Sequence, residues 1–90
     1  MKLSMTKQAQ KAIAGLDAKQ YKQVGSTIFG LFSNAEPHDS KALKGAERGE
    51  RRVDIGEYRI IYTASDDLIE VLVIGKRNDD DVYKAWERMR

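Results

Sequence analysis

The sequence predicts an α+β domain in which two N-terminal helices pack on a small antiparallel β-sheet, followed by a C-terminal helix. Three observations lead to this class. Apolar residues recur every three or four positions up to about Phe32 and every second position from Arg51 onward, which is the change from helix to strand. Turn-forming residues and the only proline, Pro37, separate the two parts. Helical spacing then returns from Val82.

The length and composition set limits on the kind of protein. With 90 residues the chain has room for one domain, and we expect residues 1–90 to fold as a single unit. Its 41% hydrophobic and 33% charged residues are typical of a small globular protein. No apolar stretch approaches the roughly 20 residues that cross a bilayer, and Met1–Met5 lacks the apolar segment of a signal peptide. We therefore expect a cytoplasmic protein with no membrane partner.

The N-terminal third predicts a short strand and two helices. Met1–Met5 is strand-like, after which Thr6 can cap a first helix and Asp17 a second. Apolar residues recur at helical spacing after each cap: Ala9, Ala12, Ile13 and Leu16, then Tyr21, Val24, Ile28, Leu31 and Phe32. Residues 33–40 gather turn formers, so the second helix should end there in a surface loop. Phe29 is also expected in the core.

Residues 51–77 predict a three-stranded antiparallel meander. Two-residue turns at Gly56–Glu57 and Asp66–Asp67 would pair Ile55 with Tyr58 and Ser65 with Leu68. One face, which should meet the two helices, then carries Val53, Ile55, Tyr58, Ile60, Tyr62, Ile69, Val71 and Val73. The other face is mixed and carries Arg52, Asp54, Arg59, Ile61, Thr63, Glu70, Leu72, Ile74 and Lys76.

The last segment predicts a helix with an apolar stripe formed by Val82, Ala85, Trp86 and Met89, of which Trp86 should be core. Asp79–Asp81 precede it, where acidic side chains suit the positive end of the helix dipole. Clustered carboxylates can also hold a hard cation. Consecutive residues on a helix turn point in different directions, so we expect neither a metal nor another cofactor.

The residue inventory restricts the chemistry that the chain could perform. There are no cysteines, which excludes disulfides and thiolate chemistry, and the single His38, in a polar loop, gives little scope for metal or histidine catalysis. The net charge of +2 is only a weak signal for polyanion binding. The candidates are four cations and a tyrosine in or just after the meander: Arg52, Arg59, Lys76, Arg77 and Tyr83. Cleavage of a phosphodiester without a metal needs such cations, plus a group that moves protons.

Four segments of the chain resemble the successive signatures of toxins of the RelE/ParE superfamily, most closely those of the RelE mRNA interferase branch. They are Leu43-Lys44-Gly45, Gly56-Glu57-Tyr58-Arg59-Ile60-Ile61-Tyr62, Val71-Leu72-Val73-Ile74-Gly75-Lys76-Arg77 and Asp81-Val82-Tyr83. The likeness covers residues 41–85 in specific positions and the preceding part only in pattern. It implies the RelE-like microbial RNase fold.

The resemblance also implies roles for individual residues. Arg59 falls on the arginine that contacts the scissile phosphate, Arg77 on one assigned to leaving-group protonation or phosphate binding, and Tyr83 on the tyrosine proposed as general base. The implied substrate-binding residues are Arg52, Lys76 and Lys44. Two departures lower the expected rate: Glu50 stands where a second basic residue is frequent, and Asp54 lies opposite Arg59 in the predicted register.

By the same resemblance, the chain would be the toxin of a toxin–antitoxin module, cleaving mRNA in the ribosomal A site by attack of the 2′-OH. Its partners would be the ribosome with its mRNA and a cognate antitoxin, with which it could form a heterotetramer. Two alternatives remain open. The chain could be a ParE-like inhibitor that binds DNA gyrase, or an inactive RelE-fold protein-binding module, which the low net charge would favour. Separately, Arg52 and Arg59 could be ordinary surface cations of the sheet, paired with Asp54 and Glu70.

Overall fold

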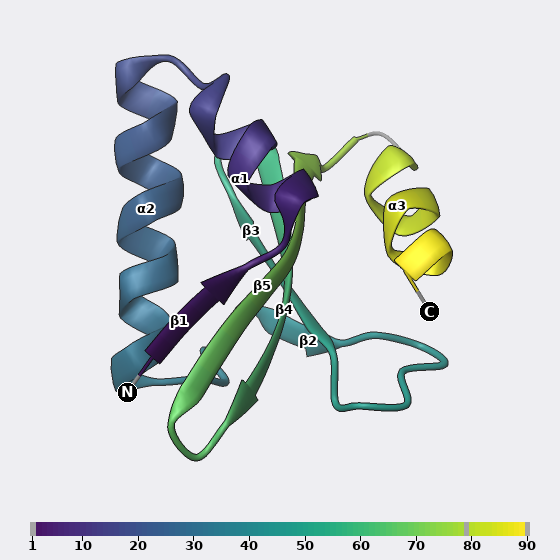
Figure 1. The fold of residues 1–90 in the computed structure, drawn as a ribbon. Coiled ribbons are helices and arrows are strands. Elements are labelled where there is room, and N and C mark those ends of the chain that lie inside the picture. The colour runs from purple at the N-terminus through teal and green to yellow at the C-terminus, as the bar shows by residue number, and fades with distance from the viewer. Residues whose placement is uncertain (1, 79, 90) are drawn as a thin grey trace.

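The computed structural model describes residues 2–78 and 80–89, and these form five strands and three helices (Figure 1). In chain order the elements are β1 (Lys2–Met5), α1 (Lys7–Ala14), α2 (Ala18–Ser33), β2 (Ser40–Ala42), β3 (Arg51–Ile55), β4 (Tyr58–Ser65), β5 (Leu68–Lys76) and α3 (Asp81–Met89). The strands make one sheet in the order β1-β5-β4-β3-β2. The helices α1 and α2 cover one side of it, and α3 lies on the other side. The predicted α+β class is confirmed.

Both predicted helix caps are present. The hydroxyl oxygen of Thr6 accepts a hydrogen bond from the backbone N–H of Ala9 at 3.2 Å, and the Asp17 carboxylate accepts one from Gln20 N–H at 2.8 Å. Each satisfies a donor that the first helical turn leaves without a backbone partner. The Thr6 hydroxyl also donates to the carbonyl of Leu72, which fixes the start of α1 against β5.

The predicted meander and its pairing at both turns are confirmed, since Ile55 pairs with Tyr58 and Ser65 with Leu68. The sheet is nevertheless mixed, because β1 pairs in parallel with β5 and β2 adds a short antiparallel edge strand. Parallel pairing joins segments far apart in the sequence, so no local turn signals it. None of the helices in the described part of the chain is long and apolar enough to cross a membrane.

A β-bulge changes which side of the sheet the end of β5 faces. The β4–β5 register shifts between Ile61, which pairs with Val73, and Tyr62, which pairs with Val71. The extra residue on β5 reverses the alternation of side chains that follow it. Val73 therefore belongs to the core under α3, and Ile74 to the core under α1 and α2. The predicted faces of these two residues were wrong.

The apolar stripe of α2 is narrower than the sequence indicates. Val24, Ile28 and Leu31 are buried, but Phe29 is 65% exposed, so the expectation of a core position for it was wrong. Tyr21, which belongs to the predicted apolar stripe, is 55% exposed. A helix lying on a sheet buries one side only, and Phe29 lies about 100° around the axis from Ile28. The expectation for Trp86 is confirmed, since it is 4% exposed.

Candidate functional site

The candidate site is on the face of the sheet that carries α3, at the start of β4. The β3–β4 register places Asp54 directly opposite Arg59 and Arg52 opposite Ile61. Because side chains alternate along a strand, Arg52, Asp54 and Arg59 all project from the face that contains Ile61 and packs against α3. The expectation that Arg52 and Arg59 share a face is confirmed.

Asp54 binds the guanidinium of Arg59 through both carboxylate oxygens. The Nε of Arg59 donates to one oxygen at 2.7 Å and Nη2 donates to the other at 3.0 Å. Nη1 of Arg52 lies 3.6 Å from the same carboxylate. The side chains of Arg59, Arg52 and Asp54 are 15%, 24% and 29% exposed, so the fork is partly shielded from water.

The hydrogen bonds between Asp54 and Arg59 shift the pKa values of both side chains. The hydrogen bond from Arg59 lowers the pKa of Asp54 below its ordinary value of 3.8, and this outweighs burial, which acts in the opposite direction. The positive charges of Arg59, Arg52 and Arg77 lower the pKa of Asp54 further. The hydrogen bond to Asp54 in turn raises the pKa of Arg59 above its ordinary value. Asp54 thus sits in the combined field of three arginines.

The remaining terminal nitrogen of Arg59 reaches α3. Nη1 donates to the phenol oxygen of Tyr83 at 2.7 Å, and the guanidinium carbon lies 5.5 Å from the centre of the Tyr83 ring. Arg59 is therefore held between Asp54 on β3 and Tyr83 on α3. A phosphate near this guanidinium would also lie near the phenol, so the arrangement can pair charge stabilisation with proton transfer.

The position of Tyr83 depends on how α3 packs. The neighbouring Val82 is 1% exposed and Trp86 4% exposed, and both belong to a small core with Leu43, Ile61 and Val73. A Cβ atom at Gly75 would lie 2.7 Å from Cγ2 of Val82, closer than carbon atoms approach. Glycine at 75 therefore allows α3 to lie directly on β5, at the position opposite Arg59.

A family model of the ParE toxin of type II toxin–antitoxin systems, parDE, matches residues 3–81 of the chain. The chain belongs to this toxin family. The resemblance to the RelE/ParE superfamily read from the sequence is thereby confirmed. No curated protein sequence matches the chain.

Solved structures of related toxins share the fold. A chain of the archaeal RelE–RelB complex from Pyrococcus horikoshii OT3 is 26% identical, with a TM-score of 0.73 over 84% of this chain and 93% of that one. The isolated RelE toxin of E. coli is 20% identical, with a TM-score of 0.71 over 98% and 97% of the two chains. The heterotetrameric YoeB–YefM toxin–antitoxin complex from Staphylococcus aureus contains a chain 20% identical, with a TM-score of 0.68 over 79% and 90%.

Arg77, Lys76 and Lys44, the other predicted site residues, do not form one cluster with Arg59 and Tyr83. Arg77 is exposed just beyond β5, where its backbone N–H donates to the carbonyl of Glu57 at 2.9 Å, and its charge reaches Asp54. Lys76 pairs with Tyr58 and so lies on the side of α1 and α2, because the bulge reverses its predicted face. Lys44 is exposed in the loop that follows β2.

Two residues near the site were not assigned a role from the sequence. Lys41 pairs with Arg52 in β2 and adds a cation to the same face of the sheet. The three residues of β2 are too short a pattern to be recognised as a strand from the sequence. Only the charge of its side chain could have drawn attention to Lys41. Glu50, noted as a departure from the family pattern, is a buried carboxylate in contact with Trp86 of α3.

The described part of the acidic run lies at the start of α3. Within residues 2–78 and 80–89 of the toxin, no group of three or more histidine, aspartate or glutamate side chains is arranged to hold a metal ion. Asp79, one of the three predicted dipole-facing acids, lies outside the described residues, whereas Asp81 is in the first turn of α3 as expected.

Proposed function

We propose that the toxin is a ribosome-dependent endoribonuclease that cleaves mRNA in the A site, without a metal, by attack of the ribose 2′-OH on the adjacent phosphate. The observation that supports this most directly is the 2.7 Å contact between Arg59 Nη1 and the Tyr83 phenol. It brings the group that would stabilise charge on the phosphate next to the group that would accept the 2′-OH proton. Cytoplasmic ribosomes would be the place of action.

The roles follow from the chemistry of each side chain. Arg59 would stabilise the pentavalent phosphate, with Arg52 adding charge from the same face, because guanidinium donors match phosphate oxygens. Tyr83 would act as general base, and Arg77 would bind the phosphate or protonate the leaving 5′-oxygen. Lys44, in its exposed loop, and Lys76 would contact RNA backbone outside the reaction centre.

The hydrogen bonds that Arg59 already makes within the toxin support the proposed dependence on the ribosome. Its donors already engage Asp54 and Tyr83, so a phosphate must compete with an internal carboxylate for the same guanidinium. A single RNA strand in solution gives few additional contacts to offset this competition. The ribosome would hold the mRNA in place and supply that binding energy. Free RNA should accordingly be a poor substrate.

Toeprinting on translating ribosomes tests the proposal. We expect new mRNA 5′ ends within A-site codons when the toxin is added, formed equally well in the presence of a metal chelator that leaves the ribosomes intact. Binding to ribosomes should weaken as salt rises, with a slope set by the number of phosphates neutralised. Intact mRNA on toxin-bound ribosomes would contradict the proposal.

Inhibition of DNA gyrase is the second candidate function. The family model that matches the chain is that of ParE, and the neutralisation of Arg59 by Asp54 suits a protein that acts by binding alone. A gyrase supercoiling assay with purified toxin discriminates the two. Accumulation of cleaved DNA with no A-site cleavage would favour the gyrase inhibitor, and neither effect would favour an inactive binding module.

A cognate antitoxin is the further partner that we propose. The structures from Pyrococcus horikoshii and Staphylococcus aureus are toxin–antitoxin complexes, and the latter is a heterotetramer. We expect a small protein encoded beside the toxin to co-purify with it and to abolish its activity. Multi-angle light scattering of the complex would then test the heterotetramer.

A further inference from the structure

We propose that Glu50 is a positioning residue for Tyr83: it holds Trp86 and thereby fixes α3 so that the Tyr83 phenol meets Arg59. This inference rests on the proposed function and names a part of the same site. Glu50 stands at a position where the resembling toxins frequently have a second basic residue, so the role belongs to this chain and does not follow from the family pattern.

Glu50 is an acidic side chain that is almost completely removed from water. It is 4% exposed, directly before β3, and both of its carboxylate oxygens accept hydrogen bonds. Oε1 accepts from the backbone N–H of Arg48 at 2.7 Å, and Oε2 accepts from the indole N–H of Trp86 at 3.2 Å. Burying a carboxylate costs free energy that an apolar residue would not, so a purely structural need for packing does not explain a glutamate here.

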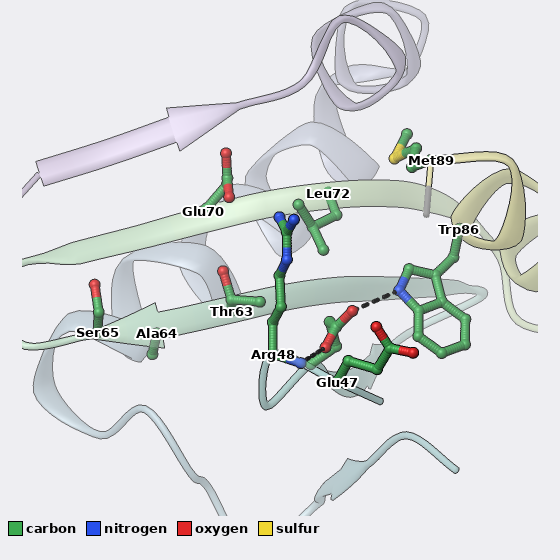
Figure 2. Close-up of a pocket in the computed structure, with 10 residues that line it drawn as sticks. Glu47, Arg48, Thr63, Ala64, Ser65, Glu70, Leu72, Trp86 and Met89 are labelled. Atoms are coloured by element: carbon green, nitrogen blue, oxygen red, sulfur yellow. Dashed lines mark hydrogen bonds between the residues drawn. The ribbon is translucent and has the colours of Figure 1, made fainter. Parts of the chain in front are cut away.

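The packing around Trp86 makes this hydrogen bond important. A pocket of ≈260 Å³ lies beside the Trp86 side chain. Its lining includes Trp86 and Met89 of α3, Glu47 and Arg48 of the loop before β3, and Leu72 of β5 (Figure 2). Met89 is 43% exposed, and Trp86 is the only buried residue among residues 85–89, so the indole is the main anchor of the C-terminal half of α3. Val82 holds the first turn, and Glu50 holds the second through Trp86.

Tyr83 lies between these two anchors on α3. Residues three apart on a helix are neighbours on its surface, so Trp86 and Tyr83 share a side of α3. A tilt or rotation of the helix that breaks the contact with Glu50 would also move the phenol away from Arg59. Misplacement of a reacting group by about 1 Å can reduce the rate of catalysis by roughly 100-fold.

Glu50 and Asp54 then each hold one part of the site in position. Glu50, Arg52 and Asp54 alternate along the chain and face the side of the sheet that carries α3. Asp54 orients Arg59 and Glu50 orients α3, so each carboxylate fixes one of the two groups that meet at 2.7 Å. In this role Glu50 acts through Trp86 and α3, so it positions Tyr83 and does not itself react.

Three variants test this role. Glu50→Leu removes both acceptors at similar volume, Glu50→Gln leaves one acceptor oxygen for two donors, and Trp86→Phe removes the indole N–H while keeping an aromatic ring. Glu70→Gln is the control, since Glu70 lines the same pocket on β5 and its neutralisation changes the charge equally. Circular dichroism would verify that each protein folds.

The first readouts do not depend on cleavage. Trp86 is the only tryptophan, so its fluorescence reports the position of α3 directly. In Glu50→Leu we expect a red-shifted emission and stronger acrylamide quenching, with smaller shifts in Glu50→Gln. The NMR signals of the Tyr83 ring, assigned with Tyr83→Phe, should shift in Glu50→Leu and Trp86→Phe. They should stay unchanged in Glu70→Gln.

The kinetic readout separates positioning from a general loss of stability. On ribosomes, Glu50→Leu should lower kcat by roughly 10- to 100-fold with little change in KM. In the Tyr83→Phe background the same substitution should change kcat less than about twofold, because no hydroxyl remains to be positioned.

Each outcome bears on the inference separately from the proposed function. Unchanged Tyr83 signals in folded Glu50→Leu and Trp86→Phe would overturn it, and so would equal losses of kcat with and without the Tyr83 hydroxyl. If wild-type toxin failed to cleave mRNA, the proposed function would fall, while fluorescence and NMR would still decide whether Glu50 fixes α3 and Tyr83.

Discussion

The Asp54 carboxylate binds Arg59 through both oxygens, at 2.7 and 3.0 Å, and leaves Nη1 of the arginine to donate to Tyr83. In the proposed function, this strongly held cation would also be the one that contacts the phosphate. The Asp54 carboxylate would then both orient the Arg59 guanidinium and compete with the phosphate for it. Several measurable properties of the toxin depend on this balance.

Asp54→Asn should strengthen binding to ribosomes. The substitution removes a negative charge beside Arg59 and Arg52 and frees donors for an RNA phosphate. We expect the affinity for ribosomes to be higher by roughly fivefold at low salt. The affinity should also fall more steeply with salt, by the slope that corresponds to about one more neutralised phosphate. Filter binding at several salt concentrations would measure both. Asp66→Asn, in the turn at the other end of β4, is the matched control and should change neither. Weaker binding by Asp54→Asn would mean that orienting Arg59 matters more than competing for it.

The contribution of the Asp54–Arg59 pair to stability should be lost at acid pH. The pKa of Asp54 is lowered in the folded state, chiefly by the hydrogen bond from Arg59, so its contribution to the free energy of unfolding is fully present above its ordinary pKa of 3.8. That contribution is lost progressively as the pH falls below this value, through the folded-state pKa. Asp54→Asn lacks the contribution at every pH. Urea unfolding from neutral pH to about pH 2 should therefore show the difference in stability between the two proteins shrinking only in the acid range.

A difference that stayed constant across that range would show that the pair contributes through packing and not through charge. The same series of measurements on Asp66→Asn, whose side chain is exposed, should give a curve close to that of the wild type.

Gly75→Ala should disturb the site through α3. The added Cβ would lie 2.7 Å from Cγ2 of Val82, so the helix must shift or the strand must bend. Overpacking of this kind costs about 1–3 kcal/mol of stability. Gly25→Ala is the matched control: an added Cβ on α2 meets nothing within 4 Å, and the change should raise the stability by about 0.5–1 kcal/mol. Thermal unfolding would measure both, and equal behaviour of the two variants would show that α3 does not lie on Gly75 in solution.

The sequence predicted the elements that local signals determine. Thr6 and Asp17 cap the helices as expected, because capping depends on residues within three positions. The tight turn at Gly56–Glu57 determines the pairing of Ile55 with Tyr58, and the alternation of the two strands then places Arg59 opposite Asp54. This central pair of the candidate site could therefore be predicted from the sequence.

The features that the sequence did not predict depend on distant contacts or on a single extra residue. The bulge at Leu72 reverses the faces of Val73, Ile74 and Lys76, and alternation alone cannot reveal it. The parallel pairing of β1 with β5 joins residues 66 positions apart, as Lys2 with Leu68. The contact between Glu50 and Trp86 likewise spans 36 positions and forms only when α3 folds back onto the sheet.

Tyr83→Phe and Arg59→Ala should differ in kind, and their comparison tests the chemistry of the site. Tyr83→Phe keeps the ring that lies 5.5 Å from the Arg59 guanidinium and deletes only the hydroxyl, so folding and ribosome binding should be nearly unaffected. If the phenol is the general base, cleavage should fall by about 100-fold or more.

Arg59→Ala should lower the rate as well, but it should also weaken ribosome binding, because in the proposed function Arg59 would contact the phosphate before the reaction. The substitution leaves the Asp54 carboxylate without its main partner, so part of its effect could come from lost stability. The double variant Arg59→Ala/Asp54→Asn also removes the charge of this carboxylate and should recover stability without recovering cleavage. Single-turnover cleavage and binding titrations on programmed ribosomes would separate the two effects. Should Tyr83→Phe remain fully toxic in cells that show gyrase-linked DNA breaks and intact mRNA, the nuclease proposal is wrong and gyrase binding takes its place.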